Sequence, residues 1–486
     1  MILSWFRSPG VSPQTIRSFE RDGEAVRPVD FASLPARDAG CTRSWPRETV
    51  ELEQLESQEK KLRKQRQAEL KQQRHGSGQP VAPPVAKDNT PDPSAYCMAY
   101  DAADRASLGL ISQMAAVGRV EDFQVLASCF PGEDRKLQKR LHPDTAGNVT
   151  TVVNPGAHDT WAEDHGEYTD AGEMVIPAML SEKFPMDSAI KNGRMRRFYP
   201  EASGLKLEDF SAYPKVEFSS QGAVNDRFTQ QEALATAMAT GASGYRMAVS
   251  YVEGGNFMPG RRADGTPFAL IGKDSLAITS EVLRRAGRQG HSMGDALKQV
   301  ARDYGLSRDQ VVPVEQPGEF HIDMAMALAG PGQVMLNDAR AVADLQKQWL
   351  EEEYAGRWFQ WGKRSALEAI EKRAEKLAEY EAMVERDLRK AGLEVYRIPG
   401  CFPATAANAE MNFFNLRQGR NAEGQAFAVA LGGEERAEKA FAETLLTRVP
   451  AGYQRIHFLD PELTELTLEM SGGIKCRTKG RVDQPA

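Results

Sequence analysis

Short apolar runs and amphipathic segments alternate along the chain from about residue 94 onward. Residues 245–252 alternate apolar and polar side chains, which predicts a half-buried strand. Residues 268–271 and 276–278 are two further short strand candidates. Ser280 is placed to cap a helix that we expect to run to about residue 304.

A hairpin pattern follows in the next part of the chain. Residues 324–328 and 333–336 are apolar runs that flank a Gly-Pro-Gly turn, as the two strands of a hairpin would. Repeated strand–strand–helix–strand units are the coarse pattern, and they predict a mixed α/β fold.

Residues 341–392 interrupt this rhythm with one long helical stretch. Its apolar side chains recur three, four or seven residues apart and form one stripe: Leu367, Ile370, Ala374, Leu377, Val384, Leu388 and Ala391. Four aromatic residues near its start are expected to pack in a core or a helix hairpin rather than to bind a ligand: Trp349, Trp358, Phe359 and Trp361.

Residues 1–93 do not have the pattern of a packed domain, and we expect a disordered N-terminal arm. Within it, residues 51–74 are mostly charged or Gln, which predicts a helix that is either solvated or bound to a partner. Residues 76–93 are rich in proline and glycine and are expected to be a linker. The globular part is therefore predicted to span residues 94–486.

Composition excludes several classes of protein. Of 486 residues, 41% are hydrophobic and 27% charged, and the net charge is −7, so no excess of positive charge indicates nucleic-acid binding. No apolar run approaches the roughly 20 residues of a membrane helix, and we expect no membrane partner. The five cysteines are scattered without a Cys-x-x-Cys pair, which favours a reducing compartment such as the cytoplasm. Export as an effector without a signal peptide remains the alternative.

His321 and Asp323 are the first candidates for chemistry. They open an apolar run, and strand alternation is expected to point both side chains to the same face. Buried ionisable groups of this kind must be satisfied by each other or by a ligand, and the motif alone leaves both alternatives open.

An acidic loop surrounds Trp161, with His158 and His165 on either side. The loop is either a metal site or a generic polar loop, and its ionisable residues are Asp159, Glu163, Asp164, His165 and Glu167.

Cys476 follows the pair Gly472-Gly473 and lies between Lys475 and Arg477. Basic neighbours depress the pKa of a thiol and favour the nucleophilic thiolate, whereas a free cysteine is otherwise most often a small buried hydrophobe. A second glycine turn, Glu253-Gly-Gly-Asn256, carries an acid.

The order of these motifs along the chain resembles that of the guanidino-group-modifying enzymes of the pentein fold. The order is Trp161-x-x-Asp164, Glu253-Gly-Gly-Asn256, His321-x-Asp323 and Gly472-Gly-Ile-x-Cys476. Residues 411–417 and the strand and helix pattern after them are similar to the penultimate module of that family. The resemblance covers about residues 150–480 and implies a five-bladed α/β propeller of ββαβ modules, with residues 341–392 as a helical insert.

Within this superfamily, the acidic loop and the long insert are most similar to protein-arginine deiminases. The resemblance implies catalytic roles for Cys476 as nucleophile and His321 as general acid and base, with Asp164 and Asp323 holding the guanidinium group. Trp161 and Asn256 are implied as further substrate-binding residues, and Glu253 as a support for His321. The resemblance allows calcium dependence, but it assigns no residue of this sequence as a metal ligand.

The implied function is hydrolysis of arginine side chains in a protein or peptide to citrulline, with release of ammonia. A small guanidine such as free arginine or agmatine is the alternative substrate, and amidino transfer is the alternative reaction. From a different class comes an inactive scaffold that binds partners through its charged helices. Lys475 stands where many relatives have His, and residues matching the calcium ligands of those enzymes are not found.

Overall fold

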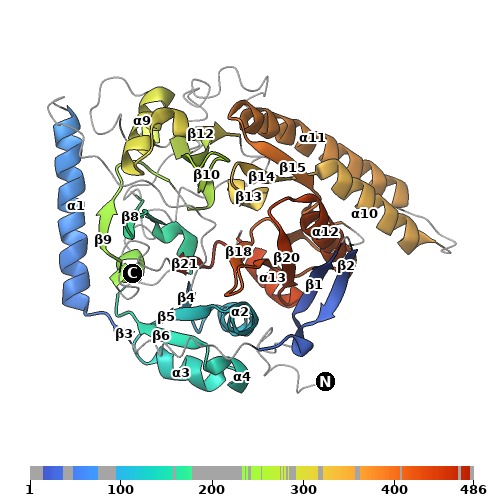
Figure 1. The fold of residues 1–486 in the computed structure, drawn as a ribbon, viewed down its shortest axis with the longest axis horizontal. Coiled ribbons are helices and arrows are strands. Elements are labelled where there is room, and N and C mark those ends of the chain that lie inside the picture. The colour runs from blue at the N-terminus through green and yellow to red at the C-terminus, as the bar shows by residue number, and fades with distance from the viewer. Residues whose placement is uncertain are drawn as a thin grey trace.

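A computed structural model gives the fold (Figure 1). It describes residues 15–23, 25–36, 48–74, 95–156, 160–177, 232–235, 237–238, 242–252, 254–273, 275–276, 279–280, 283, 292–315, 321–355, 362–405, 408–468 and 472–481. Within these ranges, no helix combines the length and the apolar character needed to cross a membrane.

One unit recurs along the described chain: two antiparallel strands, then a crossover to a third strand parallel to the second. Three consecutive units have helices as crossovers. The first contains β10 (Phe257–Arg261), β11 (Pro267–Gly272), α9 (Met293–Asp303), η7 (Arg308–Gln310) and β12 (Val311–Val314). The second contains β13 (Met326–Gly330), β14 (Gln333–Asn337), α10 (Ala339–Tyr354), α11 (Lys363–Lys390) and β15 (Glu394–Ile398). The third contains β18 (Arg417–Arg420), β19 (Ala426–Ala430), α12 (Glu435–Arg448) and β20 (Tyr453–Phe458). A short hairpin of β16 (Cys401–Phe402) and β17 (Met411–Asn412) connects the second unit to the third.

The C-terminal strand joins a further sheet whose other strands come from the first third of the chain. Its order is β21-β4-β5-β6-β3, and β21 pairs antiparallel with β4, so the C-terminal strand completes a sheet whose other strands lie before residue 154. The elements are β3 (Glu48–Thr49), β4 (Ala95–Tyr100), α2 (Ser107–Glu121), β5 (Gln124–Cys129), α3 (Glu133–Arg140), α4 (Pro143–Ala146), β6 (Val149–Val153) and β21 (Lys479–Arg481). The last three-stranded sheet contains β7 (Glu167–Tyr168), β8 (Glu173–Ile176) and β9 (Gly244–Met247). The predicted mixed α/β fold with ββαβ units is confirmed, and the closed five-bladed propeller stays a prediction.

The first strands correct the prediction of a disordered arm over residues 1–93. β1 (Arg17–Asp22) and β2 (Ala25–Asp30), followed by the turn η3 (Phe31–Ser33), form a hairpin, and β1 pairs antiparallel with β20. Phe19 is buried at 4% exposure with its ring edge on Phe458, so this hairpin belongs to the folded body. The hydrophobic pattern missed it because Arg, Glu and Asp alternate with its few apolar residues and a proline lies in β2, as suits an edge strand. The predicted linker at 76–93 lies outside the described residues.

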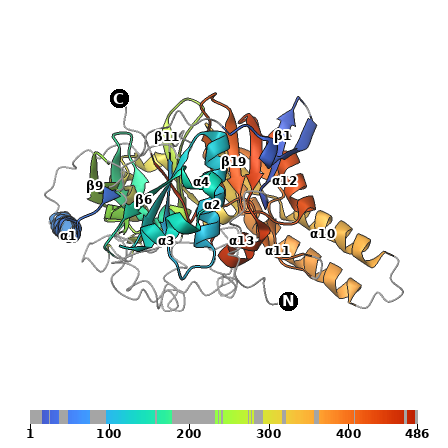
Figure 2. The same ribbon diagram turned by 90° about the horizontal axis from the view of Figure 1, so that it is seen from below.

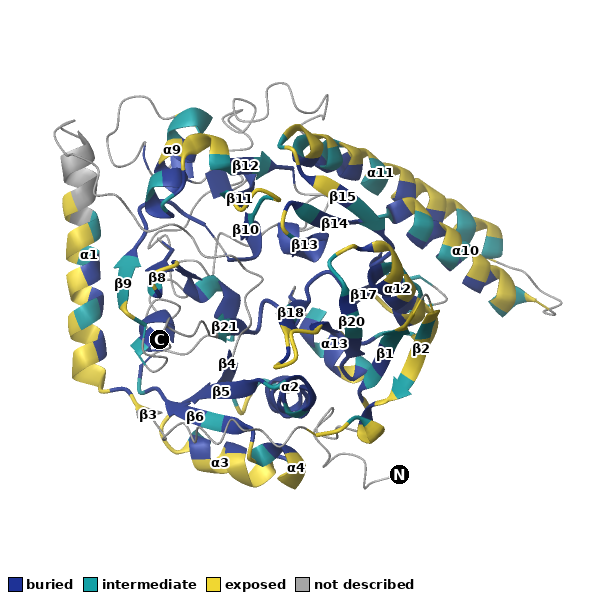
Figure 3. Cartoon of the chain, in the orientation of Figure 1, coloured by how far each residue is buried: buried dark blue, intermediate teal, exposed yellow. Residues whose placement is uncertain are grey.

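The charged segment at 51–74 is the predicted helix, α1 (Leu52–Arg74). Leu55 and Leu62, seven residues apart, are buried in an apolar cluster with residues of β8 and β9. The helix is thus attached to the body by a narrow apolar stripe, while most of its described residues are exposed (Figure 3).

The predicted helical insert is a hairpin of α10 and α11, which lies at the opposite end of the molecule from α1 (Figure 2). Trp349 is buried and stacks on Phe402, which confirms the prediction that it packs in the core. The other three aromatic residues of that group lie outside the described residues. Lys273 fixes α11 to the first unit, since its Nζ lies 3.0 Å from a Glu315 oxygen and 3.1 Å from an Asp387 oxygen.

Two local predictions in the first unit were wrong. Leu276 is helical rather than part of a strand. The capping box of α9 is made by Ser292 and Asp295, not by Ser280, which itself lies in a helical segment. The first error comes from a short apolar run, whose periodicity does not separate buried strand from buried helix.

Candidate active site

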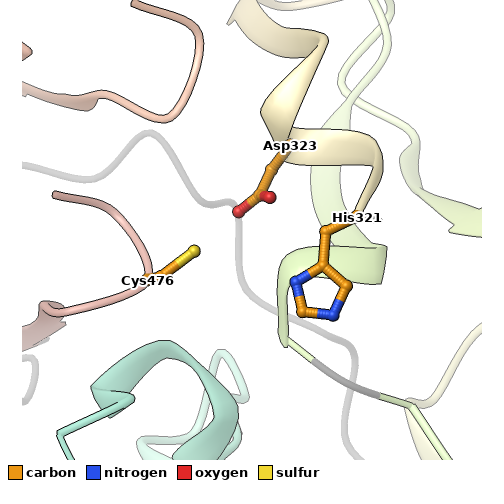
Figure 4. Close-up of side chains that lie close together, drawn as sticks. All are labelled: His321, Asp323 and Cys476. Carbon is orange, nitrogen blue, oxygen red and sulfur yellow. The ribbon is translucent and has the colours of Figure 1, made fainter. Parts of the chain in front are cut away.

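Three side chains from two distant parts of the chain face one another: Cys476, His321 and Asp323 (Figure 4). Their sulfur, ring-nitrogen and carboxylate-oxygen atoms all lie within 4.8 Å of one another. Their exposed fractions are 7%, 5% and 0%, respectively. Cys476 comes from the turn between α13 (Pro461–Leu468) and β21, so closure of the chain ends carries it to the other two groups.

The local structure around His321 differs from the prediction. Strand alternation was expected to align His321 with Asp323, but the residues from Ile322 to Met324 form a 3₁₀ turn, η8, directly before β13. His321 is the extended residue that precedes this turn. Tight turning over two residues, rather than strand alternation, therefore brings the imidazole and the carboxylate together.

Both glycine pairs are explained by close packing on site residues. A Cβ atom on Gly255 would lie 2.2 Å from His321 Nδ1, and one on Gly472 would lie 2.2 Å from the Trp161 ring. A Cβ on Gly473 would lie 2.6 Å from Asn415. These positions leave no room for a side chain, and the two glycine pairs thus let the backbone approach the site.

Asn415 holds the cysteine from two directions. Its Nδ2 donates to Cys476 Sγ at 3.1 Å, and its Oδ1 accepts from the Cys476 backbone N–H at 3.0 Å. Asn415 is not among the site residues that the sequence predicts. The available signal was its place in the segment 411–417, which carries the resemblance to the penultimate pentein module.

Asp164 and Asn256 lie in two short turns beside the cysteine segment. Asp164 belongs to η4 (Ala162–His165), and its Oδ1 accepts from the Gly254 backbone N–H at 3.0 Å. The neighbouring Glu163 N–H donates to the Cys476 carbonyl at 3.1 Å, which places η4 directly against the nucleophile. Asn256, in η6 (Gly254–Asn256), accepts from the Ile322 N–H at 3.2 Å and so ties η6 to the turn of His321.

Trp161 and Glu253 are the two remaining residues that the sequence predicts for the site, and the structure describes only the first. Trp161 packs on Gly472, and the Arg477 guanidinium lies 4.9 Å from the centre of its ring. Trp161 therefore lies next to the nucleophile segment. Glu253 lies outside the described residues, and its supporting role stays a prediction.

A buried ionic cluster underlies the site. Glu163 contacts Arg417, Lys475 and Lys479, and Lys479 also lies 3.0 Å from Glu167. Burial alone would raise the pKa of Glu163, but the three cations hold it well below its usual range. Burial raises the pKa of Glu167 to about 7, with Lys479 opposing the shift.

The sequence leaves open whether Lys475 and Arg477 activate the thiol, and in the structure both cations are paired with carboxylates. Lys475 Nζ lies 2.9 Å from Asp323 Oδ2 and 3.1 Å from Glu163 Oε1, and Arg477 is paired with Asp104. Carboxylates therefore neutralise both cations. Burial and the charge of Asp323 raise the pKa of Cys476 above its ordinary value, while a hydrogen bond and the charge of His321 act in the opposite direction.

The described residues of the site do not fit calcium. The triad of His321, Asp323 and Cys476 is, within those ranges, the one group of three or more His, Cys, Asp or Glu side chains spaced for a metal. One Asp323 oxygen already binds the Lys475 ammonium, and Asn415 donates to the sulfur. Thiol and imidazole are poor calcium ligands, and Glu163 and Glu167 face lysine and arginine, so neither group fits calcium.

No protein-family model matches the chain, and no curated protein matches its sequence. Several solved structures are similar to it, among them two agmatine deiminases. One is a variant of agmatine deiminase from C. jejuni with substrate bound, at 12% identity and a TM-score of 0.46, covering 83% of this chain and 97% of that one. The other is agmatine deiminase of Enterococcus faecalis, at 14% identity and a TM-score of 0.43, covering 83% of this chain and 99% of that one. At this level of similarity, these matches carry no conclusion about the activity of this chain.

Proposed function

We propose that this chain is a cysteine-dependent hydrolase that deiminates a guanidine substrate, and that it is a member of the guanidino-group-modifying superfamily. One observation supports the proposal: Cys476, His321 and Asp323 are all buried, and their sulfur, ring-nitrogen and carboxylate-oxygen atoms lie within 4.8 Å of one another. A nucleophile, a proton carrier and an anion at one point are the three groups that attack on a guanidinium carbon requires.

Binding of the substrate depends on its positive charge. Asp323 is fully buried, and its Oδ1 has no hydrogen-bond partner among the described residues. A guanidinium N–H donating to this oxygen forms a charge-assisted hydrogen bond and relieves a buried, unsatisfied acceptor. Asp164 is the second proposed acceptor, from the neighbouring turn η4.

The chemical step begins with transfer of the Cys476 proton to His321. A bound cation offsets the charge of Asp323, which favours the thiolate at the moment the substrate is in place. The thiolate attacks the guanidinium carbon, His321 donates a proton to the departing nitrogen, and ammonia leaves. His321 then takes a proton from a water molecule, which adds to the same carbon, and the carbon–sulfur bond breaks. His321 returns this proton to the sulfur and regenerates the thiol. The remaining proton of the guanidinium leaves with ammonia, so the products are one ureido compound and one ammonium ion.

Burial of the reacting groups supports a small guanidine, such as free arginine or agmatine, as the substrate. The nucleophile and the imidazole are 7% and 5% exposed, so a substrate must enter as a narrow chain. An arginine side chain on a protein is the second candidate, favoured by the motifs around Trp161 and by the long insert. Amidino transfer differs only in the acceptor that replaces water.

The test measures ammonia and ureido product from free arginine, agmatine and a benzoylated arginine ester in parallel, each with calcium and with chelator. We expect turnover of at least one of the small guanidines and no effect of the chelator. Turnover of the blocked ester alone would assign a protein- or peptide-directed deiminase.

Cys476→Ala is the negative variant, and Cys129→Ala is its matched control. Cys129 is also a fully buried thiol, but it lies in β5. Activity must disappear in the first and persist in the second. If folded wild-type protein releases no ammonia from any of the three compounds, the deiminase proposal fails and the scaffold alternative gains support.

A further inference from the structure

Lys475 forms two ion pairs inside the site that the proposed reaction leaves unexplained. Its ammonium lies between Asp323 Oδ2, at 2.9 Å, and Glu163 Oε1, at 3.1 Å. The side chain is 9% exposed, and both carboxylates are 1% exposed. A buried ammonium of this kind is stable only because both partners are charged, and burial alone would lower its pKa.

The two ion pairs of Lys475 join different segments of the site. Asp323 belongs to the turn that carries His321, and Glu163 belongs to the turn that carries Asp164. Lys475 itself is adjacent to Cys476. One ammonium therefore connects the three segments that supply the nucleophile, the proton carrier and both proposed substrate carboxylates.

The ion pair with Lys475 also makes the two oxygens of Asp323 unequal as acceptors for a substrate. Lys475 occupies Oδ2, whereas Oδ1 is buried and accepts no hydrogen bond from the described residues. A free carboxylate next to a guanidinium binds it through two parallel hydrogen bonds. Here one of the two oxygens is already engaged.

We propose that Lys475 is a positioning residue that presents Asp323 to the substrate through a single oxygen. The inference rests on the proposed function. The ammonium fixes the rotation of the carboxylate, so that Oδ1 meets one guanidinium N–H and the carbon stays aligned with Cys476 Sγ. It also balances part of the negative charge that the thiolate meets when it forms.

The test compares Lys475→Met with Lys475→Arg. Met keeps the approximate length and the apolar stem of lysine but loses the charge, while Arg keeps the charge and can donate to both carboxylates. In Lys475→Met we expect kcat to fall about 10- to 100-fold, because misplacement by roughly 1 Å has an effect of that size. KM should change less, because Asp323 and Asp164 both remain. Lys475→Arg should recover most of the lost kcat.

Alkylation of Cys476 by iodoacetamide, followed by peptide mass analysis, provides a readout that does not depend on turnover. Without the ammonium, the charge of Asp323 opposes the thiolate more strongly, so the midpoint of the pH–alkylation profile should rise by about one unit in Lys475→Met. Lys475→Arg should keep the wild-type midpoint.

Lys273→Met is the matched control. Lys273 is a second buried lysine with two carboxylate partners, at 3.0 and 3.1 Å, but it joins α11 to the first unit rather than contacting the site. It should change neither kcat nor the alkylation midpoint. If Lys475→Met alkylates with the wild-type midpoint and turns over at the wild-type rate, the positioning role is overturned while the deiminase proposal stands. If no substrate is turned over by the wild type, the alkylation profiles alone decide the role of Lys475.

Discussion

The amide of Asn415 clamps Cys476, donating from Nδ2 to the sulfur at 3.1 Å and accepting at Oδ1 from the backbone N–H of the same residue at 3.0 Å. Asn415 lies just before β18, and Cys476 lies just before β21. The clamp therefore joins the nucleophile to the neighbouring unit and fixes both its backbone and its side chain.

Removal of this clamp should impair turnover more than binding. In Asn415→Ala we expect kcat to fall about 10- to 100-fold with little change in KM, because the sulfur loses its fixed direction toward the substrate carbon. Steady-state kinetics on the best substrate provides the measurement. Asn148→Ala is the control: Asn148 is another buried amide, bonded to two backbone carbonyls near α2, and its loss should leave kcat unchanged. Equal kinetics in the two variants would contradict the role given to Asn415.

The nucleophile and the proton carrier should be separable by their effects. Cys476→Ala should remove turnover completely, because no other group supplies the attacking sulfur. His321→Ala should reduce kcat by about 10²- to 10⁴-fold, the usual contribution of general acid–base catalysis. Purified variants are compared in the ammonia assay. Normal turnover in His321→Ala would assign proton transfer to another residue.

The glycine pairs give a steric prediction. Gly255→Ala places a Cβ 2.2 Å from His321 Nδ1, so the imidazole must move and activity should fall by at least about tenfold. Gly147→Ala is the control, since Gly147 has helical backbone angles and open space where a Cβ would be. The kinetics of both variants are measured beside their thermal unfolding. Full activity in Gly255→Ala would mean that His321 is not held as described.

The charge of Asp323 should be visible in the pH dependence of the thiol. Burial and this carboxylate both raise the pKa of Cys476, so neutralising the carboxylate must shift the pKa downward. Asp323→Asn should therefore be alkylated by iodoacetamide with a midpoint about one or more pH units below that of the wild type, even though its turnover is lost. A midpoint that rises in Asp323→Asn would show that the carboxylate does not oppose the thiolate.

The N-terminal hairpin should contribute to global stability. Phe19→Ala removes a buried ring that packs edge-on against Phe458, which should cost about 3–5 kcal/mol of the free energy of unfolding. Phe130 is 37% exposed, and Phe130→Ala should cost far less. Denaturant unfolding of the two variants is the comparison. Equal free energies of unfolding in Phe19→Ala and Phe130→Ala would mean that residues 17–30 do not contribute to the stability of the folded body.

Local patterns were sufficient wherever one short segment decides its own structure. The ββαβ rhythm, the charged helix at 52–74 and the helical character of the insert follow from periodicity and from the positions of glycine and proline, whereas the division of the insert into α10 and α11 was not predicted. The sequence also allowed Cys476, His321 and Asp323 to be chosen as site residues. Cysteine and histidine are rare in this chain, and these three residues lie next to glycine pairs or apolar runs.

Predictions were incomplete or wrong where a segment far away in the sequence determines the local structure or the charge of a group. The sequence left the effect of Lys475 and Arg477 on the thiol open, because their partners lie far away in the sequence. Lys475 pairs with Asp323 and Glu163, and Arg477 pairs with Asp104. The edge hairpin β1–β2 has too few apolar residues to show its pairing with β20 locally. The segment 411–417 resembles a family module, but it did not reveal the role of Asn415, because that role consists of two hydrogen bonds to a residue 61 positions away.

The sequence by itself determined which side chains can do chemistry and which elements carry them, because propensity and periodicity act over a few residues. The tertiary structure decided the charge balance and the alignment of the site. Electrostatic partners and buried hydrogen bonds depend on distances across the sheets, and these are set only when β21 closes onto β4 and brings Cys476 to His321 and Asp323.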